Sequence, residues 1–195
     1  SLVERAVETL YAKVGLGFEE DLECVRAMRE AAGWDSGVLL RVDANQSWMP
    51  GEAIRTINRM AEYDLEFVDQ PVLMYNLEAL ARVRRAVSVP IASHESSWTF
   101  YSVLEVIKRD AADIIHIDPR FDAGFTGARI SAAIAEAAGL PVAHHSFTEL
   151  GVAVASFLHL IASCPNFIYA NQQGYDRLAD PVLQGGKMEF REGCL

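Results

Sequence analysis

The sequence predicts an α/β fold of the (β/α)8-barrel type, built from parallel strands that alternate with helices. Three observations predict it: short apolar runs recur along the chain, amphipathic helical patterns fill the stretches between them, and ionisable side chains follow most of the runs. A strand–helix–strand order implies parallel strands joined by right-handed crossovers. An open doubly wound sheet has the same order, but no Gly-rich phosphate loop follows any run, which lowers the case for a nucleotide-binding sheet.

The predicted strands are short and apolar, as expected for strands that are buried on both faces of a parallel sheet. They are residues 11–14, 38–42, 66–68, 89–92, 114–117, 141–143 and 167–170. These runs number seven, whereas a closed barrel has eight strands. We therefore expect an incomplete barrel that lacks its first strand.

Helices are predicted where apolar residues recur at helical spacing. In residues 51–63, Ile54, Ile57 and Ala61 share one face. Asn76 is a suitable N-terminal cap for the helix that follows it. The other predicted helices are residues 19–32, ending at Gly33, residues 127–138, ending at Gly139, and residues 152–162.

The length of 195 residues predicts a single domain over residues 1–195. Hydrophobic residues make up 51% of the chain, which is enough for a substantial core. The formal net charge of −10 disfavours nucleic acid and anionic membrane surfaces as partners. The sequence contains no apolar run long enough to span a bilayer and no secretion signal. The three cysteines, Cys24, Cys164 and Cys194, lack metal-type spacing, and we interpret them as reduced thiols of a cytoplasmic protein.

The most informative feature of the sequence is the residue at the C-terminal end of each predicted strand. Active sites of barrels are built at this end from side chains of several strands. One acidic residue after a strand means little, because Asp is common in loops and caps, but a series at successive strands is harder to dismiss. Like charges that converge must be offset by a cation, and carboxylate ligands suit Mg²⁺. The side chains are, in order, Lys13, Asp43, Asp69, Glu95, Asp118 and His145.

Longer motifs around these residues resemble those of one protein family. The motifs are Lys13-Val14-Gly15, Val42-Asp43-Ala44-Asn45-Gln46, Asp69-Gln70-Pro71 and Gly124-Phe125-Thr126-Gly127. In this order they resemble the C-terminal barrel domain of the enolase superfamily, in the mandelate racemase/muconate lactonizing enzyme family. The pairing of Asp118 with His145 is similar to the mandelate racemase subgroup. The resemblance implies a barrel of the (β/α)7β form with an N-terminal capping domain, which we expect this chain to lack.

The resemblance implies a Mg²⁺ ion held by Asp43, Asp69 and Glu95. The metal would bind the carboxylate of a small-molecule substrate and stabilise the enediolate that forms when the α-proton leaves. Lys13 would be a base on one face of the substrate, and His145, made more basic by Asp118, would be acid or base on the other. The further positions expected to contact the substrate are Tyr11, Asn45, His94, Arg120 and Asn171.

The reaction that the resemblance implies first is dehydration of a sugar acid, with racemisation or epimerisation of a 2-hydroxy acid or amino acid derivative as the alternative. A base with an acid that reaches a β-hydroxyl permits dehydration, whereas a base on each face permits racemisation. Structural alternatives stay open as well, because Asp43, Asp69 and Glu95 could simply be carboxylates that cap or start turns. Asp118 and His145 could be a structural hydrogen-bonded pair, and Arg120 could belong to a surface salt bridge. A divergent, inactive barrel that only binds metal is therefore also open. We also expect a homo-oligomer.

Four positions depart from the family pattern. Tyr11 replaces the first Lys of the usual Lys-x-Lys, and Asp69 is one methylene shorter than the usual Glu. His94 precedes Glu95, where it could compete as a metal ligand or contact the substrate. Asn171 stands near the position at which relatives of the racemase carry a Glu, and there it could donate a hydrogen bond to the substrate.

Overall fold

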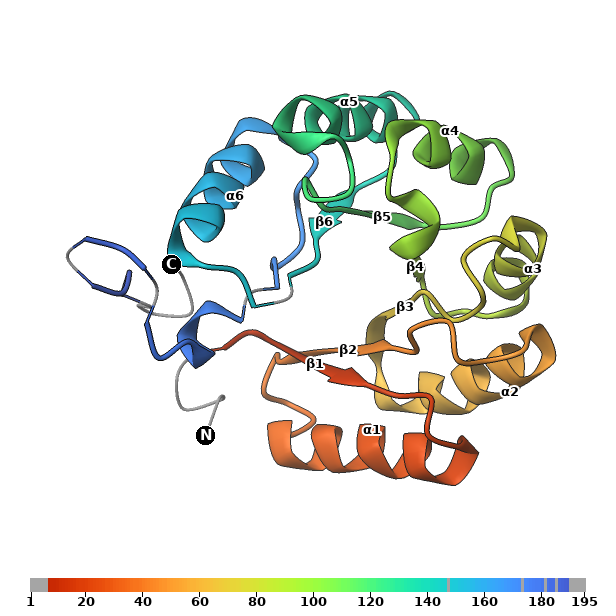
Figure 1. The fold of residues 1–195 in the computed structure, drawn as a ribbon. Coiled ribbons are helices and arrows are strands. Elements are labelled where there is room, and N and C mark those ends of the chain that lie inside the picture. Colours follow the sequence, from red (N-terminus) through yellow and green to blue (C-terminus); the bar gives the residue numbers. More distant parts are fainter. Residues whose placement is uncertain (1–6, 147, 173, 181, 185, 190–195) are drawn as a thin grey trace.

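The structure is a computed structural model that describes residues 7–189 except residues 147, 173, 181 and 185. Its centre is one sheet in which the strands lie side by side in chain order, β1-β2-β3-β4-β5-β6. Each strand pairs in parallel with the next, and the sheet curls into part of a barrel (Figure 1). The strands are β1 Thr9–Lys13, β2 Leu39–Asp43, β3 Leu65–Asp69, β4 Ile91–Ser93, β5 Ile114–Ile117 and β6 Val142–His144.

Helices cover the outer face of the curled sheet. The α-helices are α1 Phe18–Ala32, α2 Pro50–Met60, α3 Leu77–Ala86, α4 Phe100–Lys108, α5 Gly124–Ala137 and α6 Gly151–Ser163, and the 3₁₀ turns are η2 Ala61–Tyr63, η3 Glu95–Ser97 and η4 Tyr175–Arg177. The α-helices form an arc that is open between α1 and α6 (Figure 1). The described part of the chain is therefore a partial (β/α) barrel, which confirms the predicted fold class.

Local sequence features explain where the helices begin. Pro50 opens α2, where its fixed φ suits the first turn. Asn76 Oδ1 accepts a hydrogen bond from the Ala79 backbone N–H at 3.0 Å and so caps α3 as predicted. In α5, a Cβ on Gly127 would lie 1.6 Å from the carbonyl oxygen of Asp122. Only glycine permits this close approach.

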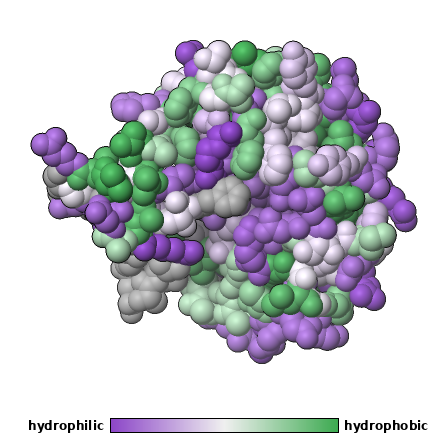
Figure 2. Space-filling model, in the orientation of Figure 1, coloured by the Kyte–Doolittle hydropathy of each residue, from purple (hydrophilic) through white to green (hydrophobic). Residues whose placement is uncertain are grey.

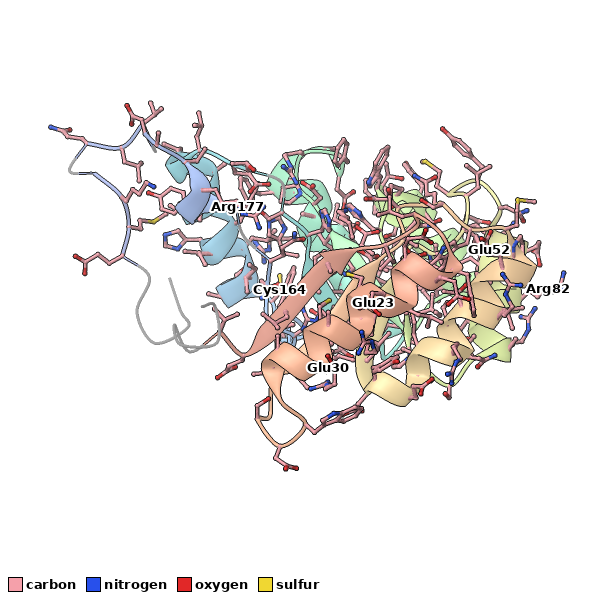
Figure 3. The ribbon with its side chains drawn as sticks, turned by 90° about the horizontal axis from the view of Figure 1, so that it is seen from below. Glu23, Glu30, Glu52, Arg82, Cys164 and Arg177 are labelled. Carbon is pink, nitrogen blue, oxygen red and sulfur yellow. The ribbon has the colours of Figure 1, made fainter. Side chains whose placement is uncertain are left out.

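The outward faces of the helices are charged. On α1, Arg26 pairs with both Glu23 and Glu30, and Figure 3 shows these two glutamates together with Arg82 of α3 on the helices around the sheet. No helix among the described residues combines the length and the apolar character needed to cross a bilayer. Cys24 and Cys164 are free thiols, while Cys194 lies outside the described residues.

Alternate strand residues point to opposite faces of the sheet. One set packs against the helices as the main core, and it includes Leu40, Val42, Val68, Ile91, Ile115, Ile117 and Val142. The other set lines the concave face, where a smaller apolar cluster forms from Phe67, Ala92, Ile114 and Ala143 with Tyr11 and Tyr169. Two positions further along each strand, on the same concave face, stand the polar side chains at the strand ends.

The predicted strands lie within two residues of observed ones, except the last. The prediction of a strand over residues 167–170 was wrong: Phe167 makes only an isolated parallel bridge to Val142. Backbone hydrogen bonds join this segment to β6 only on either side, from Val142 N–H to Asn166 O and from Gln172 N–H to His144 O, and side chains bond the stretch between them. The carbonyl oxygen of Ala170 accepts from Arg41 Nη1 at 2.6 Å, and the backbone N–H of His144 donates to Asn171 Oδ1 at 2.8 Å. This segment therefore follows β6 without pairing along its length.

Candidate functional site

Three of the predicted site residues end neighbouring strands. Lys13 ends β1, Asp43 ends β2 and Asp69 ends β3. The parallel register pairs Lys13 with Asp43 and Asp43 with Asp69. Because these residues occupy equivalent positions in adjacent strands, their side chains leave the sheet on the same face and at the same end. Figure 2 shows hydrophilic side chains gathered over the middle of this view of the molecule.

Asp43 is fully buried, and one of its oxygens lies beside Lys13 and His145. Its Oδ1 accepts from the backbone N–H of Asn45 at 2.7 Å. Its Oδ2 forms an ion pair with Lys13 Nζ and lies 3.6 Å from His145 Nε2. Burial by itself would raise the pKa of Asp43, but the His145 ring and the Lys13 ammonium lower that pKa to about 2. The group is therefore a carboxylate at neutral pH.

Asp69 is also fully buried, but it is poorly compensated. Its Oδ2 accepts from the Tyr11 hydroxyl at 2.9 Å, whereas its Oδ1 has no hydrogen-bond partner. Burial, followed by the charges of Asp43 and Glu95, raises the pKa of Asp69 well above its usual range, although the bond from Tyr11 opposes this. Burial and the charge of Asp69 in turn raise the pKa of Tyr11, which therefore stays a neutral donor. The carboxylate of Asp69 could therefore bind a further cation.

Glu95 begins η3 and completes the set of acidic groups. Its Oε1 accepts from Asn45 Nδ2 and from Gln46 Nε2, each at 3.1 Å. Its Oε2 is buried without a hydrogen-bond partner and lies 3.5 Å from His94 Nδ1. The two amides therefore fix one oxygen of Glu95 and leave the other available.

These three carboxylates fit a divalent cation. Asp69 Oδ1 and Glu95 Oε2 are buried oxygens without hydrogen-bond partners. The negative charge of each carboxylate also makes ionisation of the neighbouring carboxylates less favourable. Buried like charges of this kind are stable only when a cation or a proton offsets them. Oxygen donors are the ligands that Mg²⁺ takes in proteins. Asp43, Asp69 and Glu95, the set predicted from the sequence, could hold such an ion.

A cluster of buried histidines stands beside the carboxylates. The rings of His94 and His145 stack with centroids 3.9 Å apart, and His116 lies 5.7 and 5.8 Å from them. Burial, followed by the neighbouring histidines, lowers the pKa values of both His94 and His116 well below the usual range. Ligand atoms of Asp69, His94 and His145 all lie within 4.8 Å of one another. The structure therefore brings a second, nitrogen-containing group of possible metal ligands together.

His116 was missed in the sequence, where no chemistry was assigned to it. Its Nε2 lies 3.7 Å from Asp69 Oδ2. Its spacing from Asp118 is the signal that could have found it. His116 stands two residues before Asp118, and residues two positions apart in a strand face the same side of the sheet.

Two glutamines are further residues that the sequence did not single out. Gln70 is fully buried, and its Oε1 accepts from the backbone N–H groups of His94 and Ser96, both at 3.0 Å. It thereby holds the turn that carries Glu95. Gln46 Oε1 accepts from the Met74 N–H at 2.9 Å while its Nε2 donates to Glu95. Both follow a predicted metal ligand closely in the sequence, and this adjacency was the available signal.

Asp118 directly follows β5, but its carboxylate is bonded to Arg120. Arg120 Nε donates to Asp118 Oδ1 at 2.7 Å, and Arg120 also pairs with Glu149. Among the contacts described for Asp118, its side chain has no hydrogen bond or ion pair with His145, so their dyad stays a prediction. Arg120, expected to bind the substrate, is held between two carboxylates.

The side chain of Asn171 forms hydrogen bonds with backbone groups. Its side chain bonds the His144 N–H and the Tyr169 carbonyl oxygen at 2.8 and 3.1 Å. Its expected contact with the substrate stays a prediction.

Comparisons with known proteins agree with this geometry. The chain is 34% identical over 187 residues to a hydrophobic dipeptide epimerase of Enterococcus faecalis, covering 94% of this chain and 52% of that protein. It is 31% identical over 191 residues to a D-galactarolactone cycloisomerase of Agrobacterium fabrum, covering 94% and 50%. A dipeptide epimerase structure from Cytophaga hutchinsonii, complexed with Mg and the dipeptide D-Ala-L-Val, matches with a TM-score of 0.83 at 29% identity, covering 88% of this chain and 46% of that one.

The chain thus spans about half the length of the relatives that it matches. The family match covers all of residues 1–195 and is to the family described as enolase C-terminal domain-like. Together with the partial barrel and the acidic strand ends, this confirms the resemblance found in the sequence. The chain belongs to the enolase C-terminal domain-like family.

Proposed function

We propose that this protein removes the proton α to the carboxylate of a small substrate and returns it on the opposite face, as an epimerase or racemase that requires Mg²⁺. The observation that carries the proposal is that Lys13 Nζ and His145 Nε2 approach the same oxygen of Asp43. Two groups able to transfer protons therefore lie beside one carboxylate cluster, and a reaction with two bases needs one such group on each face of the substrate.

Asp43, Asp69 and Glu95 would hold the Mg²⁺ ion. When bound, the ion would supply positive charge to the substrate carboxylate and to the negative charge that develops as the α-proton leaves. Asn45 and Gln46 orient Glu95 through its Oε1. Outer hydrogen bonds of this kind fix the direction in which a ligand oxygen points.

The two proton-transfer groups differ in their access to solvent. The Lys13 side chain is 53% exposed, so a substrate can reach its amine. His145 is buried and its ring stacks on that of His94, which restricts the orientation of the ring. A base held in one orientation transfers a proton more efficiently, because less freedom is lost on reaching the transition state.

Dehydration of a sugar acid, the first choice from the sequence, is the second candidate. It was favoured because Asp118 was expected to support His145, and the pairing of Asp118 with Arg120 weakens that reason. His94 beside His145 is the observation that keeps it in view, because the neutral imidazole of His94 can donate a hydrogen bond to a departing β-hydroxyl. The relatives named for dipeptides make dipeptides the first substrate class to be screened, followed by sugar acids.

The test is exchange of the α-proton in deuterated water. Purified protein with Mg²⁺ is incubated with dipeptides and sugar acids, deuterium is followed by mass spectrometry, and products are separated by chiral chromatography. We expect deuterium at the α-carbon, inversion without loss of water, and no reaction in EDTA. Lys13→Met and His145→Gln should each slow turnover by about 10²- to 10⁴-fold. Each variant should lose α-proton exchange from one stereoisomer to a greater extent than from the other.

Lys108→Met is the matched control, because Lys108 is a surface lysine of α4 that pairs with Glu105. It should exchange like the wild type. Loss of water from a sugar acid would favour the second candidate. Absence of exchange with every substrate of both classes, or exchange that survives in Asp43→Asn, would contradict the proposed mechanism.

A further inference from the structure

We propose that Asp69, His94 and His145 form a second metal position that prefers a borderline transition-metal ion such as Zn²⁺ over Mg²⁺. The two positions share Asp69, so their occupation is competitive. The proposal of a nitrogen-containing site stands on the geometry alone. Its consequence for activity, given below, rests on the proposed function.

The first support is the position of the donor atoms. One oxygen of Asp69 and one ring nitrogen each of His94 and His145 lie within 4.8 Å of one another. Metal–ligand distances are about 2 Å for imidazole and carboxylate donors, so modest rotations that draw the three side chains together would complete the contact. The side chains come from the ends of β3, β4 and β6 and approach one another across the concave face.

The second support is a buried side chain whose ring nitrogens make no hydrogen bond. His94 is 1% exposed, and neither of its ring nitrogens has a hydrogen-bond partner. Asp69 Oδ1 also lacks one. Buried polar atoms in native proteins are almost always bonded, and an exception calls for an ion or another ligand. His94 is therefore a donor in need of a partner, at the position where the other two ligands converge.

The ligand types decide which ion is favoured. The carboxylate set of Asp43, Asp69 and Glu95 contains oxygen donors only, which suits the hard Mg²⁺ ion. The second set replaces two of its oxygens with imidazole nitrogens. Imidazole suits Zn²⁺, Co²⁺ and Ni²⁺, which bind nitrogen-containing sites more tightly than Mg²⁺ does. The departure at His94 thus changes the metal preference at these strand ends.

A consequence follows for the proposed reaction. A His145 nitrogen that is bound to a metal ion cannot accept the α-proton, because its lone pair is occupied. A transition-metal ion at this position also withdraws Asp69 from the Mg²⁺ set. Zn²⁺ should therefore inhibit α-proton exchange, and added Mg²⁺ should relieve the inhibition.

The test measures metal binding directly, without turnover. Metal-free protein is titrated with Zn²⁺ and with Mg²⁺ by calorimetry, and with Co²⁺ by its visible absorption. His94→Ala should weaken Zn²⁺ and Co²⁺ binding by about tenfold or more and leave Mg²⁺ binding unchanged. Glu95→Gln should do the reverse. His144→Ala is the matched control, because His144 is a buried histidine outside the ligand set whose ring bonds the Ile117 carbonyl oxygen, and it should leave the binding of both metals unchanged.

A second measurement needs no variant and so does not depend on how well His94→Ala folds. In wild-type protein labelled with ¹⁵N-histidine, Zn²⁺ should shift the ring nitrogens of two of the five histidines, and Mg²⁺ should not. Unchanged ring nitrogens under Zn²⁺, or equal effects of His94→Ala on both metals, would overturn the site. Zn²⁺ binding through His94 without inhibition of exchange would retain the site and contradict the proposed role of His145.

Discussion

The two faces of the same sheet satisfy their side chains in different ways. On the outer face, Leu40, Val42 and Ile115 are completely buried in an apolar core shared with the helices. On the concave face, equally buried positions carry Asp43, Asp69 and His116. Several polar atoms there have no hydrogen-bond partner, among them Asp69 Oδ1 and both ring nitrogens of His94.

This difference separates stability from function within single strands. Apolar burial on the outer face stabilises the fold in proportion to the area removed from water. Polar groups buried without partners on the concave face cost free energy. Such an arrangement persists when the groups serve binding or catalysis. Where a strand ends in a polar side chain, as at Val68 and Asp69 of β3, neighbouring residues therefore contribute with opposite sign to the free energy of unfolding.

The largest effect is expected from a pair of adjacent isoleucines in β5. Ile115 belongs to the outer core and Ile114 to the small concave cluster, and both are fully buried. Ile115→Ala should lower the free energy of unfolding by about 3–5 kcal/mol, because close packing against helices leaves a cavity, and Ile114→Ala by about 2 kcal/mol. Urea denaturation measures both. Equal losses would show that the two faces are packed alike.

A smaller effect of opposite sign is expected at Asp69. Asp69→Asn keeps an oxygen that can accept from Tyr11 but removes a poorly compensated buried charge beside Asp43. In metal-free protein it should raise the free energy of unfolding by about 2 kcal/mol, and it should abolish the stabilisation by Mg²⁺. Thermal unfolding with EDTA and with Mg²⁺ tests both parts. A loss of stability in EDTA would mean that the charge of Asp69 is well compensated without metal.

The smallest effect concerns pH. Burial, followed by the neighbouring histidines, lowers the pKa of His116 well below its ordinary value of 6.5. The unfolded chain then binds a proton below about pH 6.5 that the folded chain does not, so stability is present above this pH and is lost as the pH falls. His116→Gln should reduce this slope by up to about 1.4 kcal/mol per pH unit.

Urea denaturation in EDTA between pH 7 and pH 5 measures the slope. The exposed His159 of α6 supplies the control, His159→Gln, which should leave the slope as in the wild type. A slope unaltered by His116→Gln would show that the ring of His116 gains protons equally in both states.

Much of the fold was readable from local patterns. Six of the seven predicted strands and five of the six α-helices of the described residues were predicted from apolar periodicity and from end signals such as Asn76 and Pro50. The remaining helix, α4, was not predicted. The seventh predicted strand failed, because a strand needs partners along its length, and apolar composition alone cannot show whether they exist. The segment is held instead by Arg41 and Asn171.

The sequence by itself determined which ionisable residues stand at the strand ends, because strand position and direction are properties of neighbouring residues. Only the tertiary structure decided which of them touch. It paired Asp118 with Arg120, stacked His94 on His145 and set Tyr11 against Asp69. Contacts between residues far apart in the chain depend on the curvature of the sheet and on side-chain orientation, which strand order alone does not specify.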